Sequence, residues 1–375
     1  MPNKHGGATD CVVIDAGVLS VARCEIAAAI RSILDGQIGE FARDRNSVCY
    51  RIRLYGNNGT PWAAIVKVPR PGPQRTNDDT TFASEAAVLA RLPAAGIVGA
   101  PALLARVAAA GSHFLFTTEV PGKHPDARMH PLDGRQLRAI LDGLYVMDCQ
   151  CFMHYDLKVA NILIDGDRAG FIDFEFARFE GSCNAYGPTA AAFCEDFNVS
   201  GNPFFPARSN VANFEFRALH RYLVDLGATR SPGAADALLC EWLRGKSAYH
   251  RRMSGFFLDL SVTSVERAAI ISGIRTSDAR RGLRAAAAHE DLLGTLFQHP
   301  CDAVARVERM LMAFRCAIFE RHTEVARKLK EATLAEIRNN TPLTNDLPYA
   351  YRKAATRTLD LVGRSTHPQS DGTRP

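Results

Sequence analysis

The sequence predicts an α+β protein in which a strand-rich region precedes a mainly helical one. Apolar and polar residues alternate over 46–54, and an apolar run covers 62–68, which indicates two strands. Helical spacing dominates residues 233–340. With 375 residues, 47% of them hydrophobic, the chain can bury a sizeable core in two or three compact units.

The net charge and the residue composition limit the kinds of ligand that the protein is expected to bind. A net charge of +5 is compatible with acidic or phosphate-bearing ligands but too small to indicate nucleic acid. Clusters of Lys and Arg interleaved with aromatic residues, as in RNA-binding proteins, are absent from the sequence. No apolar stretch approaches the length of a membrane helix, so we expect no membrane span.

The ten cysteines are scattered and form no Cys-x-x-Cys motif. Residues 1–7 do not read as a signal peptide. We therefore expect reduced thiols and a cytoplasmic protein. A protein delivered into another cell would have the same features.

The first predicted elements are a helix and three strands. Residues 18–34 have a helical stripe, which makes residues 1–35 an N-terminal helical extension. Residues 36–39 are predicted to form a strand and turn, followed by the strands 46–54 and 62–68. The apolar residues of the helix are Val18, Val21, Ile26, Ile30 and Ile33, and those on one face of the second strand are Val48, Tyr50, Ile52 and Leu54.

Lys67 and Glu85 are predicted to form an ion pair. Lys67 ends an apolar strand, where a lone ammonium is costly. Residues 80–92 read as a helix with Thr80 as its N-cap. Glu85 falls on the apolar stripe of that helix, and an inward carboxylate needs a cationic partner. The alternative is a partly solvated Glu85 at the edge of the stripe.

A strand over 113–119 and an amphipathic helix over 137–147 lead into the most informative stretch, His154-x-Asp156-Leu157-Lys158-x-x-Asn161. An apolar run, a turn-rich segment and Asp173-Phe174-Glu175 follow, which indicates a hairpin between Asn161 and Asp173. An ordinary hairpin with solvated acidic residues at its ends is the alternative.

These residues suit phosphoryl transfer, which needs an oriented hydroxyl, Mg²⁺ and positive charge on the transferred group. Asp156 can accept a hydrogen bond from the attacking hydroxyl. Asn161 and Asp173 offer the hard oxygen ligands that Mg²⁺ prefers. Lys158 lies two residues after Asp156, on the same side of an extended backbone, and can neutralise charge on the γ-phosphate.

The two segments resemble the catalytic loop and the metal-binding Asp-Phe segment of protein-kinase-like phosphotransferases. The resemblance implies a bilobal fold, with a small antiparallel-sheet N-lobe, a larger, mainly helical C-lobe, and the cofactors ATP and Mg²⁺. The implied parts are an N-lobe over 36–120, a C-lobe core over 121–232, a helical extension or docking region over 233–363, and a disordered tail over 364–375.

The resemblance also implies nucleotide contacts. Lys67, paired with Glu85, would hold the α- and β-phosphates. Further implied contacts are Gly39, Val48, Ala64, Glu119 and Val120. The glycine-rich loop matches poorly, because Phe41 falls near the second glycine and Arg43 to Arg45 look inserted. Arg43 and Arg45 can still contact phosphate, and a surface turn is an equally good interpretation.

Later segments match less closely. Residues 183–188 and 201–208 resemble a degraded end of an activation loop, with Asn202 and Arg208 departing from the pattern. Residues 215–223 resemble the central helix of the large lobe. The spacing of Val304, Val307, Leu311, Phe314 and Ile318 predicts a core helix, with a coiled-coil seam as the alternative.

Three functions remain open. Lys158 favours a serine/threonine protein kinase, because Asp-Leu-Lys is characteristic of that class. Glu175 favours a small-molecule kinase of the choline, aminoglycoside or sugar type, and it should keep Asp173 turned toward the metal, because glycine at that position would ease a backbone flip. Phe41, Glu175 and Arg208 motivate a pseudokinase scaffold.

Overall fold

The computed structural model confirms an α+β protein and describes residues 12–16, 23–43, 47–56, 59, 61–70, 78–150, 152–179, 209–263, 276–339 and 349–364. The chain divides into two compact units. The first contains Met1–Pro121 and Gly170–Ala177, and the second contains Gly122–Ala169 and Arg178–Pro375.

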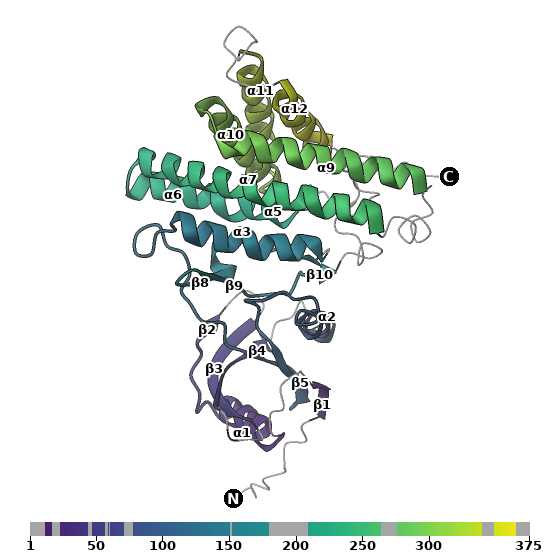
Figure 1. Ribbon diagram of the computed structural model, residues 1–375. Coiled ribbons are helices and arrows are strands. Elements are labelled where there is room, and N and C mark those ends of the chain that lie inside the picture. Colours follow the sequence, from purple (N-terminus) through teal and green to yellow (C-terminus); the bar gives the residue numbers. More distant parts are fainter. Residues whose placement is uncertain are drawn as a thin grey trace, which may run out of the picture. The chain divides into compact units, whose positions relative to one another are not determined.

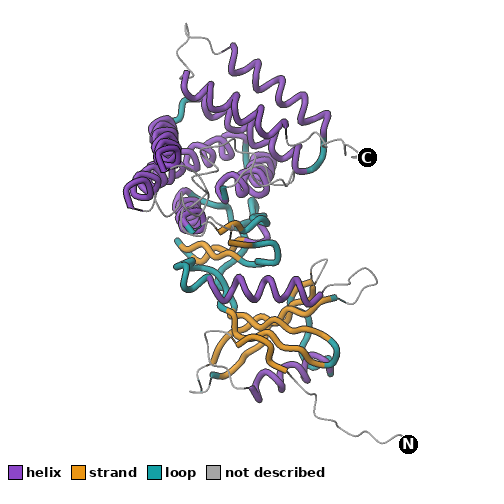
Figure 2. The backbone as a smooth tube through the Cα atoms, turned by 90° about the vertical axis from the view of Figure 1, so that its right-hand side faces the viewer, coloured by secondary structure: helices purple, strands orange, loops and turns teal. Residues whose placement is uncertain are grey.

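The first unit contains a six-stranded sheet of order β1-β5-β6-β4-β3-β2, in which every neighbouring pair is antiparallel. Figure 2 shows these strands between two helices. The strands are β1 (Val12–Ala16), β2 (Ala42–Arg43), β3 (Ser47–Tyr55), β4 (Pro61–Pro69), β5 (Leu103–Ala109) and β6 (Ser112–Thr118), and the helices are α1 (Arg23–Leu34) and α2 (Asp78–Arg91).

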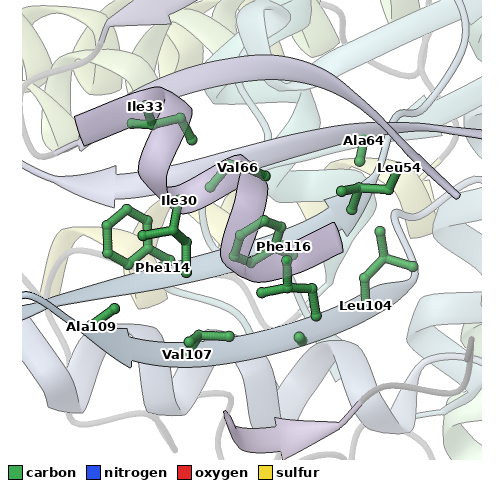
Figure 3. Packing of buried hydrophobic residues seen from close by; sticks show 13 residues of the cluster. Ile30, Ile33, Leu54, Ala64, Val66, Leu104, Val107, Ala109, Phe114 and Phe116 are labelled. Carbon is green, nitrogen blue, oxygen red and sulfur yellow. The ribbon is translucent and has the colours of Figure 1, made fainter. Parts of the chain in front are cut away.

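Helix α1 covers one face of this sheet and forms the core there (Figure 3). Ile30 and Ile33 pack with Val66 of β4 and with Phe114 and Phe116 of β6. Burial of such side chains contributes about 1.5–3 kcal/mol each. Helix α1, within the predicted N-terminal extension, therefore belongs to the hydrophobic core of the first unit.

Several sequence predictions for this unit need correction. Residues 36–39 form no strand, and β2 follows them instead. Helix α2 begins at Asp78, so Thr80 is inside the helix and is not its N-cap. The sequence interpretation missed β1 and β5. Strand β5 is buried on both faces and shows little alternation, which explains its weak signal.

The second unit begins with a helix whose start is encoded locally. Asp133 caps α3 (Gly134–Cys149) by accepting hydrogen bonds from the backbone amides of Arg135 and Gln136, and Gln136 Oε1 accepts the Asp133 N–H at 3.1 Å. This reciprocal capping box stabilises the first turn. Leu137, Ile140, Leu141, Leu144 and Met147 form the buried face.

The remaining helices of the second unit pack on α3 and on one another. Helix α7 lies along both α3 and α9, and α10 packs against α11 (Figure 1). The buried Val304, Val307, Leu311 and Phe314 make α10 a core helix, as predicted. The segments are α5 (Asn210–Phe214), the π-helical η3 (Glu215–Leu219), α6 (His220–Thr229), α7 (Pro232–Thr263), α9 (Thr276–Gln298), α10 (Asp302–Phe319), α11 (Thr323–Asn339) and α12 (Tyr349–Arg364).

The predicted hairpin is present as β8 (Ile162–Asp165) and β9 (Arg168–Phe171), with its second strand starting earlier than expected. The backbone of Gly122 packs closely against the Ile164 backbone of β8. Its φ is +124°, and an added Cβ would lie 2.8 Å from the Ile164 carbonyl carbon, so this position requires glycine.

Some predictions lie outside the described residues. They concern residues 18–22 of the predicted first helix, which include Val18 and Val21, and also Arg45, the segments 183–188 and 201–208, and the tail after Arg364. None of the described helices has the length and apolar character of a bilayer-spanning segment. The described cysteines are free thiols, as expected; they are Cys24, Cys49, Cys149, Cys240, Cys301 and Cys316.

Candidate functional site

Lys67 lies near the end of β4, on the sheet face opposite to α1. Side chains alternate along a strand, so Lys67 and Ile65 share one face, while Val66 lies on the core face. The Lys67 side chain is 10% exposed. A buried ammonium at this position needs anionic partners.

Two carboxylates supply that charge. Lys67 Nζ lies 3.0 Å from Glu85 Oε2 and 2.8 Å from Asp173 Oδ1. The other oxygen of Glu85, Oε1, accepts the backbone N–H of Phe174 at 3.2 Å. The predicted Lys67–Glu85 ion pair is therefore confirmed. The same carboxylate of Glu85 also fixes the backbone that follows Asp173.

The charge state of Lys67 follows from these contacts. Burial alone lowers the pKa of Lys67, but attraction to Glu85 and Asp173 outweighs burial and raises the pKa above its ordinary value. Lys67 is therefore a fixed cation at physiological pH. Lys67, Glu85 and Asp173 together carry a formal charge of −1, which suits a site that exchanges contacts with a divalent cation and a phosphate chain.

Asp156 lies in the second unit, inside a network that also contains the other predicted catalytic residues. Asn161 Nδ2 donates to Asp156 Oδ2 and to the Asp156 carbonyl, each at 2.9 Å. Lys158 Nζ lies 2.9 Å from Asp156 Oδ2, as the sequence spacing predicted. Arg217 Nη2 lies 2.6 Å from Asp156 Oδ1. The sequence interpretation missed Arg217.

The buried side-chain amide of Asn210 anchors the loop that carries Asp156. Asn210 Oδ1 accepts the His154 N–H at 3.0 Å, and Asn210 Nδ2 donates to the Phe152 carbonyl at 2.6 Å and to Asp148 Oδ1 at 2.8 Å. The His154 side chain is fully buried. Asn210 therefore fixes the backbone on the N-terminal side of Asp156.

Backbone strain marks both candidate segments. Tyr155 has a φ of +60° and Asp173 a φ of +66°, both in the left-handed region that L-residues rarely adopt. Such a residue costs about 1–3 kcal/mol and concentrates at functional sites. Arg217 Nη1 donates to the Tyr155 carbonyl, which helps to hold the strained turn directly before Asp156.

Asp148 gives a testable pH dependence. Burial raises its pKa to about 7, despite hydrogen bonds from Asn210 and from the Tyr249 hydroxyl. The ordinary value is about 3.9. Between about pH 4 and pH 7 the folded protein therefore binds more protons than the unfolded chain, so stability from this group is lost as pH rises.

We expect Asp148→Asn to remove this loss, because the amide is nearly isosteric and does not titrate. The gain in unfolding free energy of the variant over the wild type should grow by about 2.7 kcal/mol from pH 5 to pH 8, because the wild type loses about 1.36 kcal/mol for each of the roughly two pH units between pH 5 and its pKa of about 7. Denaturant unfolding at several pH values measures it. Asp165→Asn, at an exposed carboxylate, is the control. A difference that is constant with pH would contradict this expectation.

The predicted metal ligands suit Mg²⁺ in type and lie in different units. Asp173, in the first unit, supplies a carboxylate that is 20% exposed. Asn161, in the second unit, directs Nδ2 to Asp156, so its carbonyl oxygen lies on the opposite side of the amide. Within the described ranges, no group of three or more His, Cys, Asp or Glu side chains is arranged around a metal site. Mg²⁺ needs only one or two carboxylates when phosphates and waters complete its shell.

Two predicted nucleotide contacts are on the wrong face of the sheet. Ala64 is fully buried in the core that α1 covers, and Val48 pairs with Val68 on that same face. Residues that share a face with Lys67 include Ile65 on its own strand and its register partners Cys49 of β3 and Leu115 of β6. The period of two decides this, because Ala64 lies an odd number of residues before Lys67.

The other predicted nucleotide contacts are placed as follows. The Glu119 N–H donates to the Ala63 carbonyl at 2.9 Å and is therefore used within the sheet. Val120 follows it, half-buried. Gly39 has no positive φ, and an added Cβ would meet nothing within 4 Å, so its backbone does not require glycine. Arg43 pairs with Glu40, with Nε 2.9 Å from Glu40 Oε2.

Two residues that the sequence did not single out, Asn210 and Arg217, contact Asp156 or its loop. Asn210 and Arg217 stand 54 and 61 residues after it in the chain, on helical segments without a chemical motif. Their side chains look like ordinary polar positions of amphipathic helices. Only their tertiary contacts with the Asp156 loop identify Asn210 and Arg217 as part of the candidate site.

Comparison with known proteins adds no assignment. No protein-family model matches this chain. The chain also has no significant match among curated proteins.

Proposed function

We propose that this protein is an ATP- and Mg²⁺-dependent phosphotransferase, and more specifically a serine/threonine protein kinase with a bilobal protein-kinase-like arrangement. The observation that carries the proposal is Lys67 held between Glu85 and Asp173. A buried ammonium shared by two carboxylates, one of them partly exposed, can release Asp173 to a metal and turn to phosphate.

Each residue has a role in the proposed reaction. Lys67 binds the α- and β-phosphates, and Glu85 keeps it in position. Asp173 and the Asn161 carbonyl oxygen would hold Mg²⁺, which neutralises developing charge on the phosphates. Asp156 orients the acceptor hydroxyl, and Lys158 faces the γ-phosphate. The hydroxyl oxygen forms a bond to the γ-phosphorus, the bond to the β,γ-bridging oxygen breaks, ADP leaves, and the hydroxyl proton passes to Asp156.

The choice of a protein acceptor depends on Lys158. Its side chain is 46% exposed while its Nζ contacts Asp156, so it can reach a transferred phosphoryl group without leaving the loop. Such a lysine two residues after the candidate base is characteristic of the serine/threonine kinases that the loop resembles. The sequence resemblance therefore supports a protein hydroxyl as acceptor.

The test uses purified protein, γ-labelled ATP and Mg²⁺ with an acidic and a basic test protein. Label on protein that is lost in Asp156→Ala supports a protein kinase, and mapping of the labelled residues identifies the acceptor. Asp165→Ala, at an exposed carboxylate at the end of β8, is the matched control and should label normally. Binding of Mg·ATP without any turnover, unchanged in Asp156→Ala, would favour a pseudokinase scaffold.

A small-molecule kinase is the second candidate, because of Glu175. This half-buried residue follows the Asp173-Phe174 pair, and its charge contributes to raising the pKa of Glu85, so it belongs to the electrostatic surroundings of Lys67. ADP release stimulated by a small hydroxyl compound, without label on protein, would favour this candidate. Choline, an aminoglycoside and a hexose are suitable probes.

A further inference from the structure

Arg217 forms an ion pair with Asp156 Oδ1, the carboxylate oxygen that an acceptor hydroxyl would contact. Asp156 Oδ2 already contacts Lys158 Nζ and accepts a hydrogen bond from Asn161 Nδ2, and Oδ1 lies 2.6 Å from Arg217 Nη2. A carboxylate offers about four lone-pair sites. A hydroxyl that hydrogen-bonds to Oδ1 therefore lies directly beside the Arg217 guanidinium.

The position of Arg217 is fixed by its own segment. Arg217 lies in the π-helical η3, two residues after Glu215, whose buried carboxylate receives Lys246 Nζ at 2.8 Å, Arg315 Nη1 at 3.2 Å and Trp242 Nε1 at 2.8 Å. These partners come from α7 and α10. The C-terminal helices thus anchor the turn that presents Arg217 to Asp156.

Two other cationic side chains, Lys158 and Arg178, contact the same loop. Lys158 contacts the second oxygen of Asp156. Arg178 Nη2 donates to the Tyr155 hydroxyl at 3.0 Å, and its guanidinium lies 4.6 Å from the centre of the Tyr155 ring. Lys158 and Arg178 are both exposed, so the loop that carries Asp156 has positive charge at its surface.

We propose that Arg217 selects acceptors whose hydroxyl is flanked by acidic side chains, so that the substrates are acidic protein segments. This inference rests on the proposed kinase function. A guanidinium has five N–H donors in a planar fork and can bond to several acceptors at once, as Arg217 already does with Asp156 and the Tyr155 carbonyl. Its side chain is 16% exposed, so an acceptor carboxylate beside Asp156 can form a charge-assisted contact with it. In an extended peptide the residues two positions before and after the acceptor serine share its face, about 6.6 Å along the chain, so a carboxylate side chain at either position can reach Arg217.

The experiment compares three peptides of one length with a single serine. They differ only in the two residues on each side of the serine, which are Asp, Ala or Lys. Wild-type protein and the variants Arg217→Lys and Arg217→Glu are assayed with γ-labelled ATP and Mg²⁺, and kcat/KM is measured for each peptide. Thermal melting shows which variants are folded.

The wild type should favour the Asp peptide over the Lys peptide by roughly 10- to 100-fold, as expected for one charge-assisted hydrogen-bonded pair. Arg217→Lys should keep the preference in weakened form, and Arg217→Glu should reverse it. A merely structural role of Arg217 would lower all three rates together without changing their ratio.

Two outcomes overturn the inference in distinguishable ways. Equal rates on all three wild-type peptides, or a ratio unchanged in Arg217→Lys, reject Arg217 as a selector and leave the protein kinase function standing. Failure of the wild type to label any peptide or test protein rejects the protein kinase function, and the inference with it. Because Arg217→Lys preserves the cation, its ratio remains informative even where Arg217→Glu fails to fold.

Discussion

Replacement of Asp156 by Asn is expected to lower kcat/KM by roughly 10²- to 10⁴-fold, the usual contribution of a positioned acid or base. The amide keeps one oxygen and the size of the side chain but cannot take a proton from the acceptor hydroxyl. Asp156 lies in the second unit with the acceptor-binding candidates, and Lys67 lies in the first, so the affinity for Mg·ATP should stay within about threefold.

Single-turnover labelling and nucleotide titration separate the two quantities. Asp165→Asn makes the same chemical change at an exposed position of the β8–β9 hairpin and should match the wild type. Normal turnover in Asp156→Asn would remove this residue from the proposed mechanism. Equal loss of nucleotide affinity and turnover would instead indicate a structural role.

Lys67→Met is expected to reduce both catalysis and stability. The thioether side chain fills the space of the lysine stem but leaves Glu85 and Asp173 without the ammonium that lies 3.0 and 2.8 Å from them. Breaking a buried ion pair by removing one partner costs about 3–5 kcal/mol, and we expect about 3 kcal/mol, because the 20% exposed Asp173 can recover solvation. The value of kcat/KM should fall at least about 100-fold, since phosphate binding and positioning are lost together.

A second substitution separates these two effects. In Lys67→Met/Glu85→Gln the uncompensated buried carboxylate is gone, so denaturant unfolding should show part of the stability restored. Activity should remain at the level of Lys67→Met. Lys353→Met, at an exposed lysine of α12, is the control for loss of a surface charge. Wild-type kcat/KM in Lys67→Met would refute the assignment of the phosphate-binding lysine.

Local patterns were sufficient for much of the site. The alternation of β3 and β4, the apolar stripe of α1 and the run from His154 to Asn161 are short-range features, and the structure has the corresponding elements. The Lys67–Glu85 pair was also predictable, because a charge on an apolar face needs a partner wherever the chain leads. The kinase resemblance and its roles remain predictions.

Long-range geometry decided the rest. The resemblance implied that Ala64 and Val48 contact the nucleotide, but the strand pairing puts them on the core face with α1. Strand register and helix docking are set by contacts between segments that are distant in sequence, so local periodicity cannot specify them.

The surroundings of Asp156 show the same division. The sequence specified Asp156, Lys158 and Asn161 through their spacing within one loop. Only the tertiary structure brought Asn210 to the loop backbone and Arg217 to the Asp156 carboxylate. The physical reason is that a polar side chain on a helix becomes functional through the partner that packing gives it, and that partner is chosen by the whole fold.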